Sequence, residues 1–418
     1  MAGDAFRKPR LGDLPHDWQV MRLSELTARG PQNGLYKERG FYGRGWEMVH
    51  MPEMFSGKVI TTGGMQRVDV TDSEVSRFRL EKDDLLFARR SVAVAGSGKC
   101  SIVGRLAEVT TFESSVIRMS LKKDVASPLY VYHYIQSPPG RRQMMSITRH
   151  LTISGITGED LNEYLVPLPP LGEQYKIAEV FEHWDNAIEK IEDLVVAQQQ
   201  ERKRGLMQQL LTGRMRFKEF EDGQWRSLAL GEILNFEPRV VTKPKGAFLA
   251  AGIRSHGKGV FLKPDFEADD IALDELFQLR TDDFVLNITF AWEGAAAIVP
   301  PEADGALVSH RFPTFTFKRG VSFPGYFRHV IRQKRFVHEL GLVSPGGAGR
   351  NRVLSKSDFL HIRVELPSFE EQQRIAAVLD ASDREIELLQ KQLGALKEQK
   401  RGLMHKLLTG EVRVKVKG

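Results

Sequence analysis

The chain of 418 residues is 41% hydrophobic and 27% charged with a net charge of +6, which leaves room for two or three folded domains and permits, without establishing, a nucleic-acid partner. No apolar run approaches the roughly 20 residues of a membrane span, and the segment before Trp18 lacks the apolar core of a signal peptide. The single cysteine excludes an intramolecular disulfide and a cysteine-based metal cluster, so we expect a cytoplasmic protein with no membrane contact.

The first element in chain order is a globular block that recurs in outline in the second half of the chain. Trp18 and Leu23–Leu26 are echoed by Trp225 and Leu230–Ile233, and further anchors follow in both halves. Between these anchors the two blocks differ almost everywhere, although they are expected to share one fold. A repeat of this length that occurs only twice is a duplicated half-protein, because the units of a solenoid run about 20 to 50 residues. Such a chain is expected to aim two related modules at different targets.

A long helix is predicted after the first block. Pro167, Pro169 and Pro170 favour an extended approach to it, since each fixes φ and disfavours helix at the residue before it. Apolar residues then alternate at spacings of three and four, which is a heptad seam. The seam consists of Ile177, Phe181, Trp184, Ile188, Ile191, Val195, Leu206 and Leu210, and it is interrupted by Gln198 and Arg202.

A second helix with a more complete seam is predicted at the end of the chain. Ser368–Glu371 supplies a capping box at its start, and Gly410 supplies a C-terminal stop. Its seam contains Ile375, Leu379, Ile386, Leu389, Leu393, Leu396, Leu403 and Leu407, with Ser382 and Lys400 in the two polar gaps. Each helix would be about 55 to 60 Å long. We therefore expect the two to pair antiparallel about a pseudo-two-fold axis, rather than each packing on its own block as an ordinary core helix.

The best-matched parts of the two halves lie at the starts and ends of these helices. Glu173–Ala178 recurs as Glu371–Ala376, and both helices end in Leu-Leu-Thr-Gly, at 210–213 and 407–410. Together with motifs of the first block, these segments resemble the specificity subunits of Type I restriction-modification systems over essentially the whole chain. The motifs of the first block that carry the resemblance are Asn33–Lys37, Asp84–Arg90, Thr110–Ser115 and Ser154–Ile156.

The resemblance implies a mixed α/β (α+β) fold of two target-recognition domains joined by two long helices that form an antiparallel coiled coil. The expected boundaries are 1–166 for the first recognition domain, 167–216 for the first helical spacer, 217–364 for the second recognition domain and 365–418 for the second spacer. It also implies a non-catalytic subunit that recognises an asymmetric bipartite site in double-stranded DNA for two methyltransferase and two restriction subunits. No cofactor is expected on this chain, because S-adenosylmethionine, ATP and magnesium would bind to those partners.

The sequence lacks the motifs that catalysis or metal binding would need. No Asn-Pro-Pro-Tyr or Asp-Pro-Pro-Tyr is present to hold a flipped adenine, and no histidine pair has metal-ligand spacing. Gly96–Cys100 resembles a phosphate loop only briefly, because Ala93 replaces its first glycine and Cys100 stands where Ser or Thr would bind magnesium. We interpret this segment as a turn.

Sequence readout requires side chains that reach base edges, above all Arg or Lys for guanine and Asn or Gln for adenine. In the first block the candidates are Asn33, Tyr36, Lys37, Arg44, Arg89, Arg90, Lys99, Arg149 and His150. In the second block they are Lys243, Lys245, Arg254, His256, Lys258, Trp292, His310, Arg311, Arg350, Asn351 and Arg352. A solvated surface charge competes with this role at each position. Tyr36–Lys37 and Arg89–Arg90 are favoured because they lie in family-like motifs beside turns.

The basic ends of the long helices are assigned differently. Arg202, Lys203 and Arg204, with Lys397, Lys400 and Arg401, are expected to support the coiled coil or a methyltransferase dock rather than bind DNA. Three other functions stay open. The chain could be the specificity subunit of a related system with a fused methyltransferase and nuclease, a coiled-coil scaffold that does not read sequence, or a stand-alone DNA enzyme.

Overall fold

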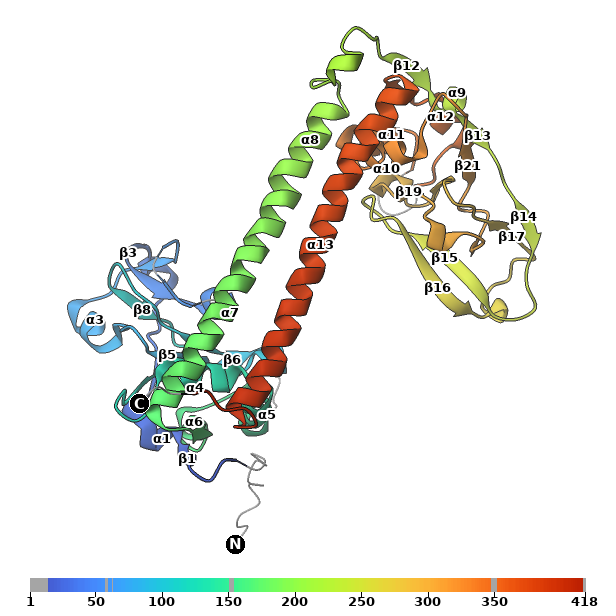
Figure 1. The fold of residues 1–418 in the computed structure, drawn as a ribbon. Coiled ribbons are helices and arrows are strands. Elements are labelled where there is room, and N and C mark those ends of the chain that lie inside the picture. The colour runs from blue at the N-terminus through green and yellow to red at the C-terminus, as the bar shows by residue number, and fades with distance from the viewer. Residues whose placement is uncertain (1–13, 57–58, 62, 150–153, 347–351, 416–418) are drawn as a thin grey trace. The chain divides into compact units, whose positions relative to one another are not determined.

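The two halves of the chain are distributed over two compact units. The computed structural model describes residues 14–56, 59–61, 63–149, 154–346 and 352–415. The first unit contains Met1–Glu192 and Lys391–Gly418, and the second contains Asp193–Gln390. Each unit therefore holds one globular block, the start of the helix that follows this block, and the end of the other copy's helix (Figure 1).

A four-stranded antiparallel sheet forms the centre of the first unit, in the order β2 (Thr27–Asn33), β9 (Val116–Leu121), β5 (Leu85–Ala88) and β7 (Cys100–Ile102). A second sheet has the order β4 (Arg67–Val68), β3 (Tyr42–Val49) and β8 (Thr110–Phe112), with β3 and β8 parallel. The first unit also contains two separate antiparallel strand pairs. They are β1 (Gln19–Arg22) with β11 (Leu165–Leu168), and β6 (Arg90–Ser91) with β10 (Ser154–Gly155). The helices are α1 (Leu23–Leu26), α2 (Met51–Phe55), α3 (Asp72–Phe78), α4 (Pro128–Gln136), α5 (Pro138–Ile147), α6 (Gly158–Asn162) and the first part of α7 (Leu171–Ala197).

The second unit repeats the central sheet in the order β13 (Leu234–Phe236), β21 (Thr314–Phe317), β18 (Phe284–Leu286) and β19 (Ala296–Ile298). Its other sheet has five strands, β14 (Val240–Thr242), β17 (Glu275–Gln278), β20 (Leu307–Val308), β15 (Phe248–Ile253) and β16 (Val260–Phe266), and β12 (Arg226–Ala229) pairs with β22 (Arg363–Leu366). The helices are α8 (Lys203–Leu210), α9 (Leu230–Ile233), α10 (Pro324–Val330), α11 (Lys334–Leu342), α12 (Lys356–His361) and the first part of α13 (Phe369–Leu408). The expectation that the blocks share one fold is therefore confirmed for the central sheet, while the second sheets differ in size.

The repeated Asp-Asp pair forms the same turn in both units. Asp83 and Asp282 have left-handed backbone conformations, with φ of 76° and 68°, which Asp tolerates better than most residues. The carboxylates that follow, Asp84 and Asp283, are buried and accept hydrogen bonds from backbone N–H groups three residues earlier, at 2.8 and 2.9 Å. Burial raises the pKa of both carboxyls. These anchors fix the turns that lead into the central strands β5 and β18.

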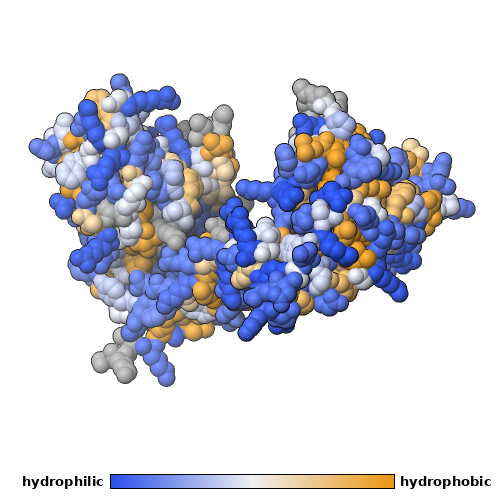
Figure 2. All heavy atoms as spheres, turned by 90° about the horizontal axis from the view of Figure 1, so that it is seen from above, coloured by the Kyte–Doolittle hydropathy of each residue, from blue (hydrophilic) through white to orange (hydrophobic). Residues whose placement is uncertain are grey.

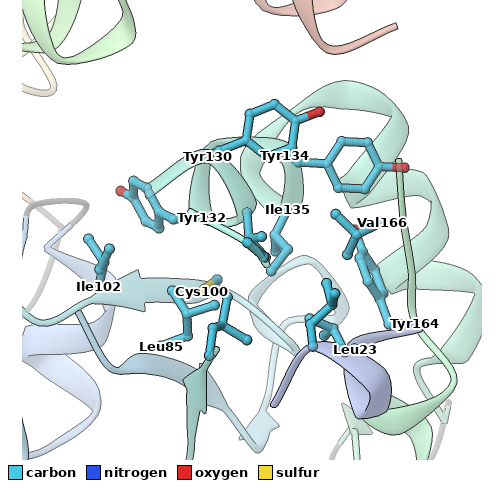
Figure 3. Packing of buried hydrophobic residues seen from close by; sticks show 14 of the residues in the cluster. Leu23, Leu85, Cys100, Ile102, Tyr130, Tyr132, Tyr134, Ile135, Tyr164 and Val166 are labelled. Carbon is cyan, nitrogen blue, oxygen red and sulfur yellow. The ribbon is translucent and has the colours of Figure 1, made fainter. Parts of the chain in front are cut away.

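The core of the first unit joins the central sheet to α4 and to the start of α7. Figure 3 shows Tyr130 and Tyr134 of α4 packed above the sheet, with Tyr164 beside Val166. The same core takes in Phe181 of α7 and, from α13, Leu407 and Leu408. The expectation that the long helices do not pack on their own blocks is therefore wrong for their first turns, because these turns contribute side chains to the block's core.

His133 of α4 is buried in this region, and its pKa is shifted far from the usual value of a histidine. Its side chain is 2% exposed, its Nε2 atom makes no hydrogen bond, and its ring centroid lies 5.0 Å from that of Phe181. Burial lowers the pKa of His133 to about 3, and the positive charge of Lys400 acts in the same direction. The folded protein therefore holds this imidazole in its neutral form.

We expect His133 to make the protein less stable in mild acid. Its pKa is about 3 in the folded chain and about 6.5 when unfolded. The unfolded chain therefore binds the extra proton, and stability falls as the pH drops from about 6.5 toward 3. Between pH 7 and 5 this loss is about 2 kcal/mol. His133→Phe should remove it, measured by urea unfolding at both pH values. The exposed His183→Gln serves as control, and an unchanged pH dependence in His133→Phe would contradict the assignment.

The predicted seams are confirmed by burial. Every predicted seam position of α13 is buried or half-buried, whereas Leu388, which the seam omits, is 66% exposed. Ion pairs link the two helices within each unit. They are Lys397–Glu192 at 2.6 Å and Lys400–Asp185 in the first unit, and Arg202–Glu385 at 3.4 Å and Lys203–Asp383 in the second. Residue numbers rise along one helix as they fall along the other, so the pairing is antiparallel in each unit.

The interruption of the first seam coincides with a π-helical turn, Gln198–Arg202, between α7 and α8. A π turn takes in an extra residue and shifts the face that later side chains present. The Arg202 side chain is accordingly 61% exposed, whereas that of Lys203 is 14% exposed and pairs with Asp383. The basic residues that pair in this way stabilise the helix pair, in agreement with the role assigned to them.

The repeated Glu-Gln motif closes each unit through an ion pair made by its buried glutamate. Arg413 donates from Nε and Nη2 to Glu173, at 2.7 and 2.6 Å, and Arg216 donates in the same way to Glu371, at 3.0 and 2.6 Å. Each glutamate side chain is at most 3% exposed. The predicted capping box at Ser368 is therefore only half formed. The Ser368 hydroxyl accepts from the Glu371 N–H at 3.2 Å, but the Glu371 carboxylate binds Arg216 instead of returning to the cap.

The helix ends follow the predicted pattern. α13 ends at Leu408, and Gly410 adopts a φ of 76°, the left-handed conformation expected of a C-terminal glycine. Gly213 ends the first helix in the same way, with a φ of 68°. Hydrophilic side chains cover most of the face drawn in Figure 2. Within the described ranges, no helix is both long and apolar enough to cross a bilayer.

Candidate nucleic-acid interface

Three loops of the first unit meet at one end of its central sheet. The Arg89 N–H, directly after β5, donates to the Ser115 carbonyl at 2.8 Å, and the Ile156 N–H donates to the Arg89 carbonyl at 3.0 Å. Arg89 thus ties the loop after β5 to the loop before β9 and to the segment before α6. A Cβ atom on Gly34 would lie 2.2 Å from the Glu113 carbonyl oxygen, so the backbone after β2 packs closely against the loop before β9.

The second unit has the same frame with different side chains. The Ile288 N–H donates to the Arg311 carbonyl at 3.0 Å, and the Leu354 N–H donates to the Ile288 carbonyl at 2.9 Å. Ile288 therefore stands in the place of Arg89, Arg311 in the place of Ser115, and Leu354 in the place of Ile156. We call this frame the three-loop surface. It comprises 89–97, 113–115 and 154–156 in the first unit, and 287–294, 309–312 and 352–354 in the second.

The three-loop surface of the first unit carries few charges that are free to bind a ligand. The Arg89 Nη1 atom donates to the Ser114 carbonyl at 3.3 Å, which holds its guanidinium against the loop. Arg90 is exposed and makes no ion pair with another described residue. Asn33 is exposed at the end of β2, and Val92 is 88% exposed. Arg90 and Val92 are therefore the large accessible side chains of this surface, and Asn33 is accessible beside it.

Several predicted readers of the first unit are already paired with other groups of the same unit. Lys37 is 11% exposed, pairs with Glu74 at 2.8 Å and lies 4.7 Å from the Phe41 ring centroid. This contact lowers the pKa of Glu74. Lys99 donates to the Phe55 carbonyl at 3.1 Å, and burial lowers its pKa. The remaining ion pairs are Arg44–Asp69 at 2.9 Å and Arg149–Asp160 at 3.1 Å. Tyr36, in contrast, is 74% exposed, and His150 lies outside the described residues.

A fourth loop joins the three-loop surface in the second unit. The hairpin between β15 and β16 carries Arg254, His256 and Lys258, all exposed. Its tip turns sharply at His256, whose φ is 61°. The His256 N–H donates to the Glu293 carbonyl at 2.8 Å, and the Ser255 hydroxyl donates to the Glu293 carboxylate at 2.8 Å. Three predicted readers are thereby brought next to the loop that contains Trp292.

The same surface gathers two arginines, one held against an aromatic ring and one against a hydroxyl. The Arg352 guanidinium lies 5.3 Å from the Trp292 ring centroid, a cation–π contact that fixes its plane. Arg311 is exposed and donates from Nη1 to the Thr289 hydroxyl at 3.3 Å. His310 and Phe290 are exposed on the adjoining loops. Guanidinium groups held against rings and hydroxyls can offer paired donors to the acceptor edge of a guanine.

The other predicted readers of the second unit lie away from this surface or outside the described residues. The Lys243 Nζ atom donates to the carbonyls of Ala268 and Ile271, at 3.3 and 3.0 Å, so its ammonium group is occupied by backbone acceptors. Lys245 is exposed between β14 and β15, and no hydrogen bond links it to the three-loop surface. Arg350 and Asn351 lie outside the described residues.

Sequence reasoning missed three accessible or positioning residues, Val92, Thr289 and Phe290. Aligning the two halves from the shared Asp-Asp turn would have found them, because 287–294, between β18 and β19, corresponds to the segment that begins at Ala88, the last residue of β5. In the loop before β9, the Glu113 carboxylate accepts from the Met51 N–H at 3.0 Å and so holds that loop in place.

One group of side chains has metal-like geometry but is already neutralised. His329, Asp380 and Asp383 offer ligand atoms within 4.8 Å of one another. Arg328 lies 3.8 Å from Asp380, and both Lys203 and Arg332 pair with Asp383. Three cations around two carboxylates oppose binding of another cation. We therefore assign the group to helix packing.

The family model for the Type I restriction modification DNA specificity domain matches residues 15–196 and 224–398, one match in each half. A putative specificity subunit of the type I restriction enzyme MjaX, from Methanocaldococcus jannaschii, is 24% identical over 98% of this chain and 97% of its own length. The specificity subunit of the EcoKI enzyme of Escherichia coli is 29% identical over 35% of this chain and 32% of its own length. The S subunit of the Type I restriction-modification system of M. genitalium has a similar fold, with a TM-score of 0.57 at 15% identity, covering 97% of this chain and 99% of that one.

Proposed function

Because this chain belongs to the family of Type I restriction modification DNA specificity domains, we propose that the three-loop surface of each unit reads one half of a bipartite DNA target. The observation that carries the proposal is the repeated backbone frame with unlike side chains. Its hydrogen bonds from Arg89 and Ile288 are equivalent, while the exposed groups around them differ. A constant frame positions the reader, and variable side chains select the bases. The target is therefore expected to be asymmetric.

Cations on this surface, with one amide beside it, are the proposed base readers. Arg90 and Asn33 serve in the first unit, and Arg311 and Arg352 serve in the second. Arginine pairs with guanine and asparagine with adenine in the major groove. Trp292 orients Arg352, and the hairpin residues Arg254, His256 and Lys258 contact phosphates or neighbouring bases. Lys37 and Lys243 instead stabilise the unit, because each is occupied by protein groups.

The proposed assembly contains two methyltransferase and two restriction subunits on double-stranded DNA in the cytoplasm. Relatives named as specificity subunits of type I restriction enzymes support this assignment. S-adenosylmethionine, ATP and magnesium are assigned to the partners. The proposed recognition domains are 1–166 and 217–364, with 167–216 and 365–418 as helical spacers. Each spacer then contains the glutamate of its own Glu-Gln motif near its start. Near its end it contains the arginine that pairs with the glutamate of the other spacer.

The single substitutions Arg311→Ala and Arg352→Ala should each weaken methylation at the cognate site by about 1 to 3 kcal/mol, if these side chains read bases. The loss should be confined to particular positions of one half-site and is measured by sequencing the methylated sites with the cognate methyltransferase present. Lys245→Ala is the matched control, because it removes an exposed cation outside the surface. An equal loss on all sequences, with a shallower salt dependence, would make the contact one with phosphate.

A selection experiment separates this function from its rivals. The purified chain, with and without methyltransferase, is bound to a random DNA pool. Enrichment of a bipartite motif supports the specificity subunit. A chain that enriches no sequence is a scaffold, and one that cleaves or methylates DNA without a partner is an enzyme. Identification of the proteins encoded beside it distinguishes separate partner subunits from a fused methyltransferase-nuclease.

A further inference from the structure

The second unit contains a groove that the three-loop surface does not use. It encloses about 930 Å³ between α8, α11 and the end of the strand pair β12–β22. We call it the α8–α11 groove and define it by Arg204, Met207, Val330, Lys334, Arg335 and Ile362. All of these residues belong to the second unit. The groove is lined by apolar side chains at its floor and by basic side chains at its rim.

The corresponding place in the first unit is filled by two tyrosines. The Leu23 N–H donates to the Tyr164 carbonyl, and the Leu230 N–H donates to the Ile362 carbonyl, so Ile362 stands where Tyr164 stands. Tyr164 and Tyr134 are fully buried and pack edge to face, with ring centroids 6.3 Å apart (Figure 3). Smaller aliphatic side chains at this place leave space open in the second unit.

A second pair of equivalent contacts identifies the residue that stands in the place of Tyr134. Gln174 accepts from the Ser127 N–H at 2.8 Å, and Gln372 accepts from the Phe323 N–H at 2.9 Å, so α4 and α10 begin at equivalent positions. Counting along both helices from these contacts places Val330 where the first unit has Tyr134. Two of the residues that line the floor of the groove, Val330 and Ile362, thus replace the two tyrosines of the first unit.

Two of the three cations at the rim of the groove have no counterpart in the first unit, whereas Arg204 corresponds to Arg401 there. Arg204, Lys334 and Arg335 are exposed and make no ion pair with another described residue. The equivalents of Lys334 and Arg335 at the start of α5 are Pro138 and Pro139, which carry no charge. Two carboxylates, Glu339 and Glu365, also line the groove but do not balance its cations. Positive potential over an apolar floor complements an acidic segment that carries an apolar side chain.

We propose that the α8–α11 groove binds an acidic segment of a partner protein. One apolar side chain of that segment occupies the space lined by Met207, Val330 and Ile362, and its carboxylates pair with Arg204, Lys334 and Arg335. In the first unit, tyrosines replace Val330 and Ile362, and prolines replace Lys334 and Arg335, so the partner binds one of the two units only. A subunit present in one copy can therefore distinguish the two halves of a chain that is otherwise built as a repeat.

The test uses the full chain and a random dodecapeptide library. Selection on the wild-type chain should enrich peptides with several Asp or Glu residues around one large apolar residue. A fluorescent copy of the most enriched peptide is then titrated against four proteins. They are the wild type, the double variant Val330→Tyr with Ile362→Tyr, the charge reversal Lys334→Glu with Arg335→Glu, and the control Arg214→Glu with Lys218→Glu. The control makes the same change of charge at exposed positions outside the groove.

Filling the floor and reversing the rim should each weaken peptide binding by roughly tenfold or more, and the control should bind like the wild type. Replacing the apolar residue of the peptide with Ser should cause a similar loss. If Val330→Tyr with Ile362→Tyr does not fold, the charge reversal and the peptide change still decide the outcome. Enrichment of no acidic peptide would overturn the proposal, and so would binding that is indifferent to the floor and to the apolar residue. Weaker binding of duplex DNA in the charge reversal, without acidic peptide binding, would make the groove a phosphate-contacting surface instead.

Discussion

Replacing Arg216 with alanine is expected to destabilise the second unit by about 3 to 5 kcal/mol. Its guanidinium binds both oxygens of Glu371, whose side chain is only 1% exposed, and Arg216 itself is 17% exposed. Without the arginine, a carboxylate remains buried with no cation beside it, and this loss exceeds the small net value of the intact pair. The measurement is urea unfolding of the full chain at neutral pH.

A matched control is available two residues away. Arg214 is exposed and makes no ion pair with another described residue, so Arg214→Ala should change stability by roughly 0.5 kcal/mol or less. The combination of Arg216→Met with Glu371→Leu removes both charges and should recover much of the loss. If Arg216→Ala costs no more than Arg214→Ala, the buried pair is not what closes this unit.

Local patterns in the sequence were sufficient to predict the long helices. A seam that repeats every three or four residues predicts a helix face wherever it occurs, and the predicted seam residues between Ile375 and Leu407 are buried or half-buried as expected. The contacts of Glu173 and Glu371 could not be read in this way. Arg413 lies 240 positions from Glu173 in sequence, and no local pattern relates the two. The same limitation explains the capping box, because Ser368–Glu371 fits the local motif while a distant arginine takes its carboxylate.

Predicting the candidate interface from sequence was harder because residue type does not show whether a charge already has a partner. Lys37 lies in a family-like motif, yet Glu74 holds it nearly buried. Arg311 and Arg352 lie in no such motif, yet the frame around Ile288 brings their loops together. The repeat itself was the best available guide. Aligning the two halves places the variable positions of one block on those of the other, and these positions surround a shared set of backbone hydrogen bonds.

Copying the second block into the first is expected to change one half of the DNA target and leave the other unchanged. In this variant 234–358 replaces 27–160. The junctions fall in equivalent places, directly after α1 and α9 and within the first turns of α6 and α12. Tyr164→Ile is included so that the grafted Val330 meets the neighbour it has in the second unit. Both halves of the recognised motif should then read the same sequence, as determined by sequencing the methylated sites in cells that supply the cognate methyltransferase.

The outcome depends on where base reading resides. If the three-loop surfaces read the bases, the graft carries Arg311 and Arg352 with their frame, and the half-site of the second block appears twice. A folded graft that still binds methyltransferase but methylates the original motif would place base reading outside 27–160, for example on the helices. A change in both halves would show that the two blocks do not read independently. Restoring Ser115 and Ser154 at the grafted copies of Arg311 and Arg352 should abolish the new half-site while the resident one persists, because these arginines supply the donors that a guanine edge requires.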